Sequence, residues 1–121
     1  MKLLIVEDNH QMRRLIKRIV SNLADCIIEC SDGSEALAAY RAHHPDYVLM
    51  DIRMKKVDGL TATRQIKAVF PDARIVLVTD YDDDALRADA LSAGASRYVV
   101  KERLWTLIDV LPRTVDPDTG S

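Results

Sequence analysis

The chain alternates short apolar runs with longer segments whose apolar residues recur at helical spacing. Its first run, Leu3-Leu4-Ile5-Val6, contains no polar residue and stops at Glu7-Asp8. Unbroken runs of this length are typical of strands that are buried on both faces of a sheet. Similar, mostly apolar runs predict four more strands, over residues 26–30, 47–50, 75–78 and 97–100.

Each predicted strand is followed by a predicted helix. Asn9 is a favourable N-cap, and the apolar positions from Met12 to Leu23 follow helical spacing with basic residues on the other side. The other helices are bounded by turn and cap residues. They are expected from the turn at residues 31–34 to His44-Pro45, over residues 60–70 before Pro71, from Asp82-Asp83-Asp84 to Gly94, and over residues 104–111.

Five apolar strands that alternate with five helices predict an α/β domain. Strands of this kind form a parallel sheet with helices on both faces. Ligands of such sheets bind beyond the carboxyl ends of the strands. The polar residues that directly follow each strand are therefore the candidates for chemistry.

Composition adds bounds to this picture. The 121 residues are 48% hydrophobic and 30% charged, which predicts one globular domain with a core that needs no disulfides. The 17 Lys and Arg nearly balance the 19 Asp and Glu, so the net charge of −2 gives no general attraction to nucleic acid or to an anionic membrane. With no membrane-spanning run and no signal-sequence pattern, we expect a cytoplasmic protein.

The thiols and the imidazoles suggest no metal or redox site. Cys26 and Cys30 lie four residues apart, which in a strand separates them by roughly 13 Å on one face, too far for a disulfide. We predict that both are small core residues. His10, His43 and His44 lack partners at metal-ligand spacing and are predicted at turns or on the surface.

Polar residues at the strand ends form the strongest functional signal. Glu7 and Asp8 follow the first strand, Asp51 the third, Thr79 the fourth and Lys101 the fifth. Close carboxylates repel one another unless a cation neutralises them, and oxygen ligands suit Mg²⁺. A lysine and a hydroxyl beside such a site would stabilise a phosphoryl group in transfer to a carboxylate. Helix capping is the alternative explanation for the acids, but it requires neither Lys101 nor Asp51.

Together with neighbouring motifs, these residues resemble the receiver domain of bacterial two-component response regulators. The resemblance extends from Met1 to Leu111, and its motifs occur in the order typical of that family. They are Glu7-Asp8, Met50-Asp51-Ile52-Arg53-Met54 with Asp58-Gly59, Thr79, Gly94-Ala95 and Tyr98-Val99-Val100-Lys101. The resemblance implies a flavodoxin-like (βα)5 fold with strand order 2-1-3-4-5.

The resemblance also implies a role for each site residue. Asp51 would be the phosphoacceptor, modified by a partner histidine kinase or phosphotransfer domain. Glu7, Asp8, Asp51 and the backbone carbonyl of Arg53 would hold Mg²⁺. Lys101 would pair with the acids and then with the phosphoryl oxygens, Thr79 would hydrogen-bond the phosphate, and Tyr98 would follow Thr79 between two rotamers. Ordinary strand packing is the alternative for Tyr98.

Such a domain is a signalling module that assists its own phosphorylation and dephosphorylation rather than an enzyme. Its switch would change the surface formed by the fourth helix, the fifth strand and the fifth helix. Two segments are most similar to those of receivers that carry a C-terminal helix-turn-helix domain, namely Asp82-Asp83-Asp84 and residues 94–98. We therefore expect a transcriptional output, a homodimer on phosphorylation, and DNA contact only through an output domain outside this sequence. Residues 1–112 would form the receiver, and 113–121 a disordered polar tail or the start of a linker.

Three positions depart from the family pattern. Lys55 stands where the family usually has proline, which predicts a looser loop after Asp51. Asp80, where the family has a small residue, predicts slower phosphorylation, and Glu102 replaces another common proline. The basic stripe at residues 13–18 is predicted to be a solvated face, with kinase docking as the alternative.

Two other functions remain open from the sequence. A degenerate receiver would bind a partner without phosphorylation, although the intact acidic set disfavours it. A phosphohydrolase of the haloacid dehalogenase type would also use an aspartate nucleophile. The pattern typical of that family has two aspartates two positions apart after the first strand. Here Asp51 follows the third predicted strand, and Arg53 stands where the second aspartate would be.

Overall fold

The computed structural model describes residues 1–111, and its centre is a parallel sheet of five strands in the order β2-β1-β3-β4-β5. The strands are β1 (Lys2–Val6), β2 (Cys26–Cys30), β3 (Tyr47–Asp51), β4 (Ile75–Thr79) and β5 (Arg97–Val100). This is the predicted flavodoxin-like order, and each strand lies within one residue of its predicted bounds. The predicted tail at residues 113–121 lies outside the described residues.

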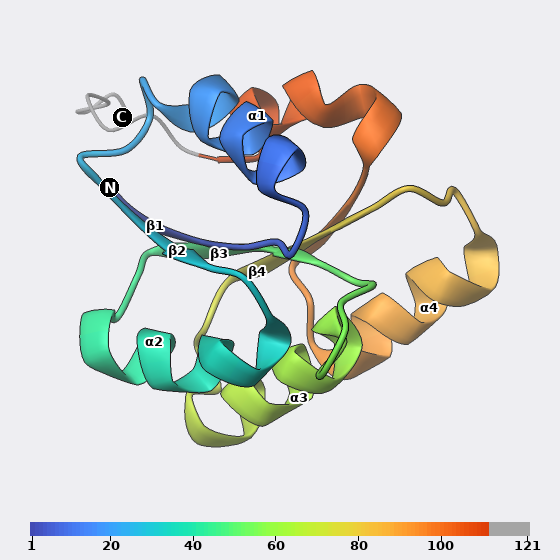
Figure 1. Ribbon diagram of the computed structural model, residues 1–121. Helices are drawn as coiled ribbons and strands as arrows, with labels where there is room; N and C mark the ends of the chain where they lie inside the picture. The colour runs from blue at the N-terminus through green and yellow to red at the C-terminus, as the bar shows by residue number, and fades with distance from the viewer. Residues whose placement is uncertain (112–121) are drawn as a thin grey trace, which may run out of the picture.

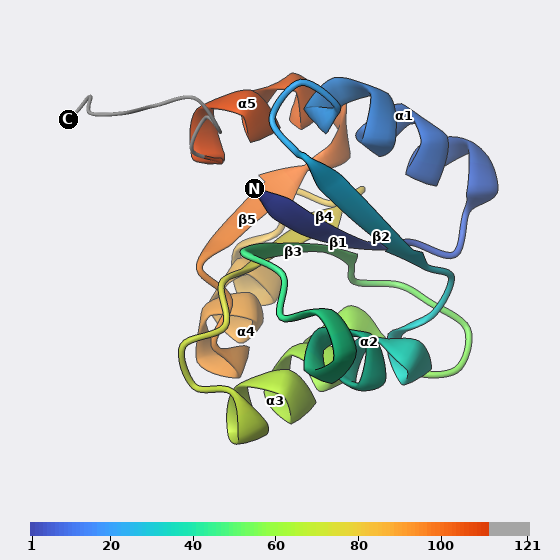
Figure 2. The same cartoon turned by 90° about the vertical axis from the view of Figure 1, so that its left-hand side faces the viewer.

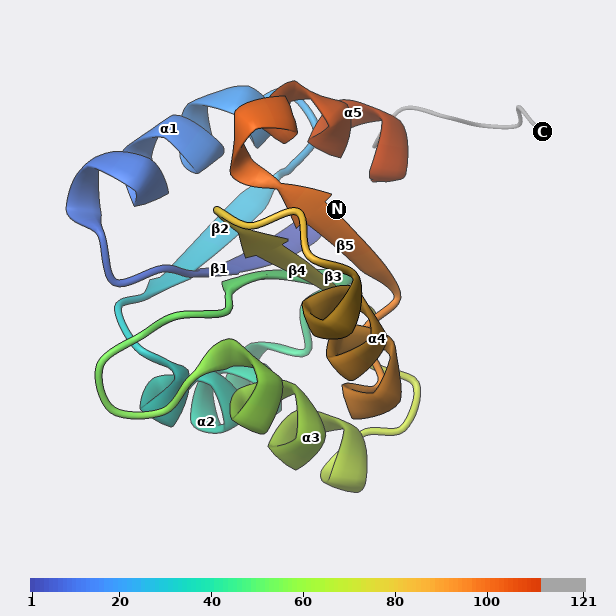
Figure 3. The ribbon, with the colours of Figure 1, turned by 90° about the vertical axis from the view of Figure 1, so that its right-hand side faces the viewer.

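Helices cover both faces of the sheet (Figures 1 and 2). On one face lie α1 (His10–Val20) and α5 (Leu107–Val110), and on the other lie α2 (Ala36–His43), α3 (Gly59–Val69) and α4 (Asp84–Ala93). Short 3-10 segments, Gly33–Glu35 and Lys101–Thr106, precede α2 and α5. Figure 3 shows the same two layers from the opposite side. Among the described residues, no helix combines the length and apolar character needed to cross a membrane.

The two helical layers explain why the strands are mostly apolar. Successive side chains of a strand point to opposite faces, so a strand buried on both sides has no solvent-facing position. In β1, Leu4 and Val6 pack toward α2 and α3, whereas Leu3 and Ile5 pack toward α1 and α5. All four side chains are fully buried.

Cap residues set the helix ends as predicted. The Asn9 side chain accepts a hydrogen bond from the Met12 N–H at the start of α1, and Asp83 caps α4 in the same way. Gly94 ends α4 with a φ of 103°, a left-handed conformation that glycine adopts without steric cost.

The last predicted helix and one cysteine differ from expectation. Residues 101–106 are 3-10 helix with a kink at Arg103, and only Leu107–Val110 is α-helical. Leu104 and Leu107, three residues apart, both reach the core through this tighter winding. Cys30 is buried as predicted, and burial raises the pKa of its thiol to about 11, but Cys26 is exposed. The prediction for Cys26 was wrong because it begins the edge strand β2, where cover is incomplete.

Candidate functional site

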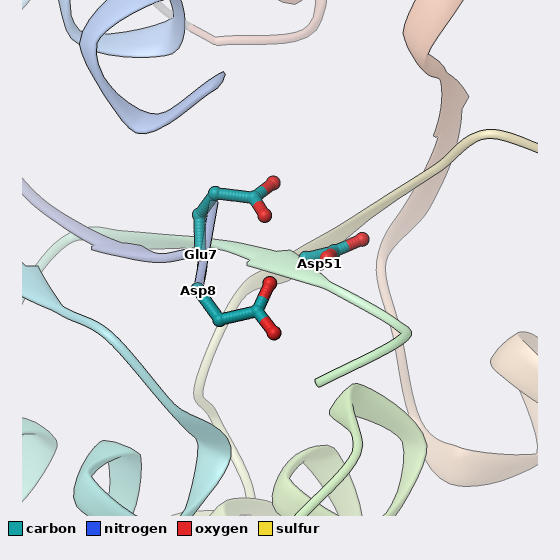
Figure 4. Close-up of side chains that lie close together, drawn as sticks. All are labelled: Glu7, Asp8 and Asp51. Atoms are coloured by element: carbon teal, nitrogen blue, oxygen red, sulfur yellow. The ribbon is translucent and has the colours of Figure 1, made fainter. Parts of the chain in front are cut away.

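Three carboxylates converge where β1 and β3 end. Glu7 and Asp8 follow β1, and Asp51 is the last residue of the neighbouring strand β3. Figure 4 shows the three side chains projecting from these adjacent strand ends. One carboxylate oxygen of each lies within 4.8 Å of the others. Glu7 is fully buried and Asp51 is only 6% exposed, so water screens their repulsion poorly.

Lys101 supplies the positive charge that faces this cluster. It directly follows β5, and its Nζ lies 3.1 Å from Oε1 of Glu7 and 3.2 Å from Oδ1 of Asp51. Its side chain is 10% exposed. The ammonium therefore forms largely buried ion pairs with two carboxylates from two different strands.

One lysine does not balance the acids, and the pKa values reflect this. Burial, and then the nearby Asp51 carboxylate, raise the pKa of Glu7 to about 7. Burial also raises the pKa of Asp51, although Lys101 partly offsets the effect. Burial by itself lowers the pKa of Lys101, but the negative charges of Asp51 and Glu7 outweigh it and the pKa rises. The site thus carries an excess of negative charge that favours binding of a cation or a proton.

The cluster opens into a cleft of about 560 Å³. The walls carry the three acids and Lys101, and also Asn9, Gln11, Met12, Leu15, Arg53 and Asp80. Arg53, whose carbonyl oxygen is the fourth predicted metal ligand, therefore faces the same space. Oε1 of Glu7 is buried and pairs with the Lys101 ammonium, which leaves it able to take a further partner. Carboxylate oxygens without histidine or cysteine form a donor set that fits Mg²⁺.

Comparison with known proteins assigns the sequence to a family. The sequence model of the response regulator receiver domain matches residues 3–110. The chain belongs to the response regulator receiver domain family. The predicted resemblance is thereby confirmed over nearly the whole described chain.

Relatives of this receiver domain differ in what surrounds the domain. The chemotaxis protein CheY of Bacillus subtilis is 39% identical over 101 residues, which cover 83% of this chain and 84% of CheY. The transcriptional regulatory protein DegU of Brevibacillus brevis is 32% identical, but its matching region covers 84% of this chain and only 44% of DegU. This receiver domain therefore spans nearly the length of CheY but less than half the length of DegU.

Solved structures share the fold. A two-component response regulator of the LuxR family from Aurantimonas sp. SI85-9A1 superposes with a TM-score of 0.81 at 30% identity, covering 97% of this chain and 90% of that one. CheY in the CheX-CheY-BeF3-Mg²⁺ complex of Borrelia burgdorferi has a TM-score of 0.81 at 28% identity, covering 91% and 88% of the two chains.

Thr79 and Tyr98 are joined through a residue that the sequence did not single out. Thr79 ends β4 fully buried, and its Oγ1 accepts a hydrogen bond from the Tyr81 N–H at 3.3 Å. The Tyr98 hydroxyl donates to the Tyr81 carbonyl oxygen at 2.5 Å. The Arg53 guanidinium lies over the Tyr81 ring, 4.5 Å from its centroid. No sequence signal identifies Tyr81, because its backbone makes both bonds to the predicted switch residues.

The basic stripe on α1 is only partly solvated. Arg13 donates to the Glu7 carbonyl oxygen at 2.6 Å and to the Glu29 carboxylate at 3.2 Å, with its side chain 15% exposed. The prediction of a solvated face was wrong for Arg13, because it ties α1 to the ends of β1 and β2. Arg14 and Arg18 are exposed, as are the three histidines, whose surface placement is confirmed.

The pKa of Glu7 predicts how stability depends on pH without metal. Between the ordinary glutamate pKa of 4.5 and about 7, the folded protein keeps a proton that the unfolded chain has lost. The free energy of unfolding therefore falls as pH rises through this range. We expect a loss on the order of 1–3 kcal/mol from this group between about pH 5 and about pH 8, and a smaller loss in Glu7→Gln.

Urea unfolding of the metal-free protein at the two pH values measures this difference. Glu102→Gln is the control, because Glu102 is an exposed carboxylate outside the cluster. It should keep the parental pH dependence. An equally steep decline in Glu7→Gln and in the parent would contradict the assignment.

Proposed function

We propose that this receiver domain accepts a phosphoryl group on Asp51 from the phosphohistidine of a histidine kinase or phosphotransfer domain. One observation carries the proposal: the Asp51 carboxylate contacts Lys101 at 3.2 Å and lies at a cleft beside the Glu7 and Asp8 carboxylates. An aspartate that only stabilises the fold needs neither the neighbouring carboxylates of Glu7 and Asp8 nor access to a cleft.

The transfer would use Asp51 as the nucleophile. A carboxylate oxygen of Asp51 forms a bond to phosphorus as the phosphorus–nitrogen bond of the donor breaks, and the electron pair leaves with the imidazole. Lys101 is placed to hold the negative charge of the phosphoryl oxygens through its ammonium group. Because Lys101 already contacts Asp51, its side chain needs to move little to serve this role.

The acids around Asp51 suit a magnesium ion. We propose that Glu7, Asp8, Asp51 and the Arg53 carbonyl hold Mg²⁺, with Glu7 acting directly or through water. When bound, Mg²⁺ supplies the positive charge that three carboxylates and an incoming phosphoryl group require. Glu7 and Asp8 then serve to hold the cation beside Asp51.

The link through Tyr81 supports a route from the phosphoryl group to the surface. If Thr79 turns to donate its hydroxyl proton to a phosphoryl oxygen, the Tyr81 N–H loses its acceptor. Movement of the Tyr81 backbone would then displace the acceptor of Tyr98. Tyr98 lies on β5, and its ring also holds the Arg87 guanidinium of α4 at 4.5 Å. We propose that the surface of α4, β5 and α5 changes in this way.

The output proposed for this surface is transcription, through a DNA-binding domain outside these 121 residues. The similarity to DegU, a transcriptional regulatory protein more than twice as long as the matched region, supports this assignment. We propose further that phosphorylation promotes a homodimer and that the domain acts in the cytoplasm. Its role would be that of a signalling module rather than an enzyme with a separate substrate.

Mass spectrometry tests the phosphoryl transfer. Incubation with Mg²⁺ and acetyl phosphate should add one phosphoryl group to the intact protein. The adduct should survive acid and be removed by hydroxylamine, because it is an acyl phosphate. Asp51→Asn should show no adduct, since its amide is not a nucleophile, and Asp46→Asn, an exposed aspartate before β3, should react normally.

An adduct of equal yield in Asp51→Asn would place the acceptor elsewhere. No adduct from either acetyl phosphate or a histidine kinase would favour a receiver that binds its partner without phosphorylation. Steady hydrolysis of phosphate esters would instead favour the phosphohydrolase.

Asp80 should slow the reaction. Asp80 lines the cleft. Burial lowers the pKa of Lys101, but the charges of Asp51 and Glu7, with a further contribution from Asp80, raise it. A negative charge at this position repels the phosphodonor. We expect Asp80→Ala to be phosphorylated several-fold faster than the parent, measured as the initial rate with acetyl phosphate.

Asp82→Ala is the matched control for Asp80→Ala. Asp82 is an exposed aspartate of the same loop, paired with Arg87 at 2.8 Å, and it does not line the cleft. Its rate should equal that of the parent. Equal rates for Asp80→Ala and the parent would refute the repulsion.

A further inference from the structure

Two loops on the α2–α3 side of the sheet lie against each other. One is the turn at residues 31–34 between β2 and α2, and the other is the loop at residues 52–58 that follows Asp51 (Figure 2). A hollow of about 260 Å³ lies between them, and Asp8 forms part of its wall. The contact between the loops therefore borders the carboxylate cluster.

The Asp32 carboxylate makes the polar connection between the loops. Its Oδ1 accepts the Lys56 N–H at 3.0 Å, and its Oδ2 accepts the Val57 N–H at 3.2 Å and the Ser34 N–H at 2.8 Å. The side chain is nearly buried, with the residue 8% exposed. Burial alone raises the pKa of Asp32, but the N–H groups of Lys56, Ser34 and Val57 outweigh it and hold the pKa at about 2. Charge-assisted bonds of this kind are about twice as strong as neutral ones.

Gly33 brings the two backbones close together. A Cβ on this residue would lie 2.3 Å from the Val57 carbonyl oxygen and 3.3 Å from the Ala62 side chain. Any larger residue would push the second loop away. The turn is thus fitted to this loop by shape as well as by hydrogen bonds.

At the centre of the loop after Asp51, Met54 and Val57 pack against the core, and within residues 1–111 the backbone hydrogen bonds of Lys56 and Val57 go to Asp32. At its base, the Gly59 N–H donates to the Ile52 carbonyl oxygen at 2.7 Å. Its centre carries Lys55 where a proline would fix the backbone, which led to the expectation of a loose loop. The two bonds from Lys56 and Val57 to Asp32 hold this segment from the side instead.

We propose that Asp32 is a positioning residue for the phosphoacceptor site, holding the loop so that Arg53 presents its carbonyl beside Asp51. The proposal rests on the proposed function of Asp51. It assigns to Asp32 a task beyond capping the turn, where its bond to the Ser34 N–H would suffice. Holding the loop in place before the cation and donor arrive lowers the ordering cost of binding them.

Asp32→Ser separates the two tasks. A serine hydroxyl is a good cap for the Ser34 N–H but is too short to reach the second loop. Asp32→Asn is the conservative variant, because its single amide oxygen replaces only part of the acceptor capacity. Glu35→Gln is the control, since Glu35 ends the neighbouring 3-10 segment and its carboxylate accepts a hydrogen bond from Ser31 rather than from the second loop.

Two readouts are measured on each folded variant. Amide hydrogen exchange should become at least 10-fold faster at Lys56 and Val57 in Asp32→Ser, with little change at Ser34. The rate of phosphorylation by acetyl phosphate, at a fixed Mg²⁺ concentration, should fall about 10-fold. Asp32→Asn should lie between the parent and Asp32→Ser in both readouts, and Glu35→Gln should match the parent.

Two results would overturn the proposal. Unchanged exchange at Lys56 and Val57 would show that Asp32 does not hold the loop. Faster exchange with an unchanged phosphorylation rate would reduce Asp32 to a structural cap. If the parent itself took no phosphoryl group, the proposed function would fail and the positioning role with it, a result distinct from the other two.

Discussion

The ion pairs of Lys101 with Glu7 and Asp51 are the interaction on which the rest of the site depends. Three carboxylates meet at one edge of the sheet, two of them buried, and one ammonium faces them. Burial of a charge is costly unless it is paired, so this arrangement is unfavourable for stability alone. The raised pKa of Glu7 reflects that cost, because burial and the Asp51 charge disfavour its ionised form. A site that tolerates excess negative charge in the folded protein is prepared to bind a cation.

The fold imposes this crowding. In a parallel sheet all strands end at the same edge, so residues that directly follow separate strands become neighbours. Because β1 and β3 are adjacent, Glu7 and Asp51 meet although they are 44 positions apart in the sequence. The helices on both faces bury most of β1, β3 and β4, which limits the screening of the charges at these strand ends by water.

Sequence patterns predicted the features that burial and local capping determine. Five apolar runs identified the strands, and the polar residues after them identified the acids, Thr79 and Lys101. Contacts that join distant loops were not predictable in the same way. The Tyr81 link uses backbone groups that every residue has, and the Asp32 contact joins residues 24 and 25 positions apart. The expectation of a loose loop at Lys55 considered only the missing proline, not a carboxylate supplied by another turn.

Magnesium binding tests most directly whether the crowded carboxylates are a cation site. Isothermal titration calorimetry of Mg²⁺ into the protein, at slightly alkaline pH where Glu7 is ionised, should give one ion per chain. Asp8→Asn should weaken the affinity at least 10-fold, because it removes a charged ligand. Asp89→Asn, an exposed carboxylate of α4, should leave the affinity unchanged. Equal Mg²⁺ affinity in Asp8→Asn and the parent, or no binding at all, would contradict the account.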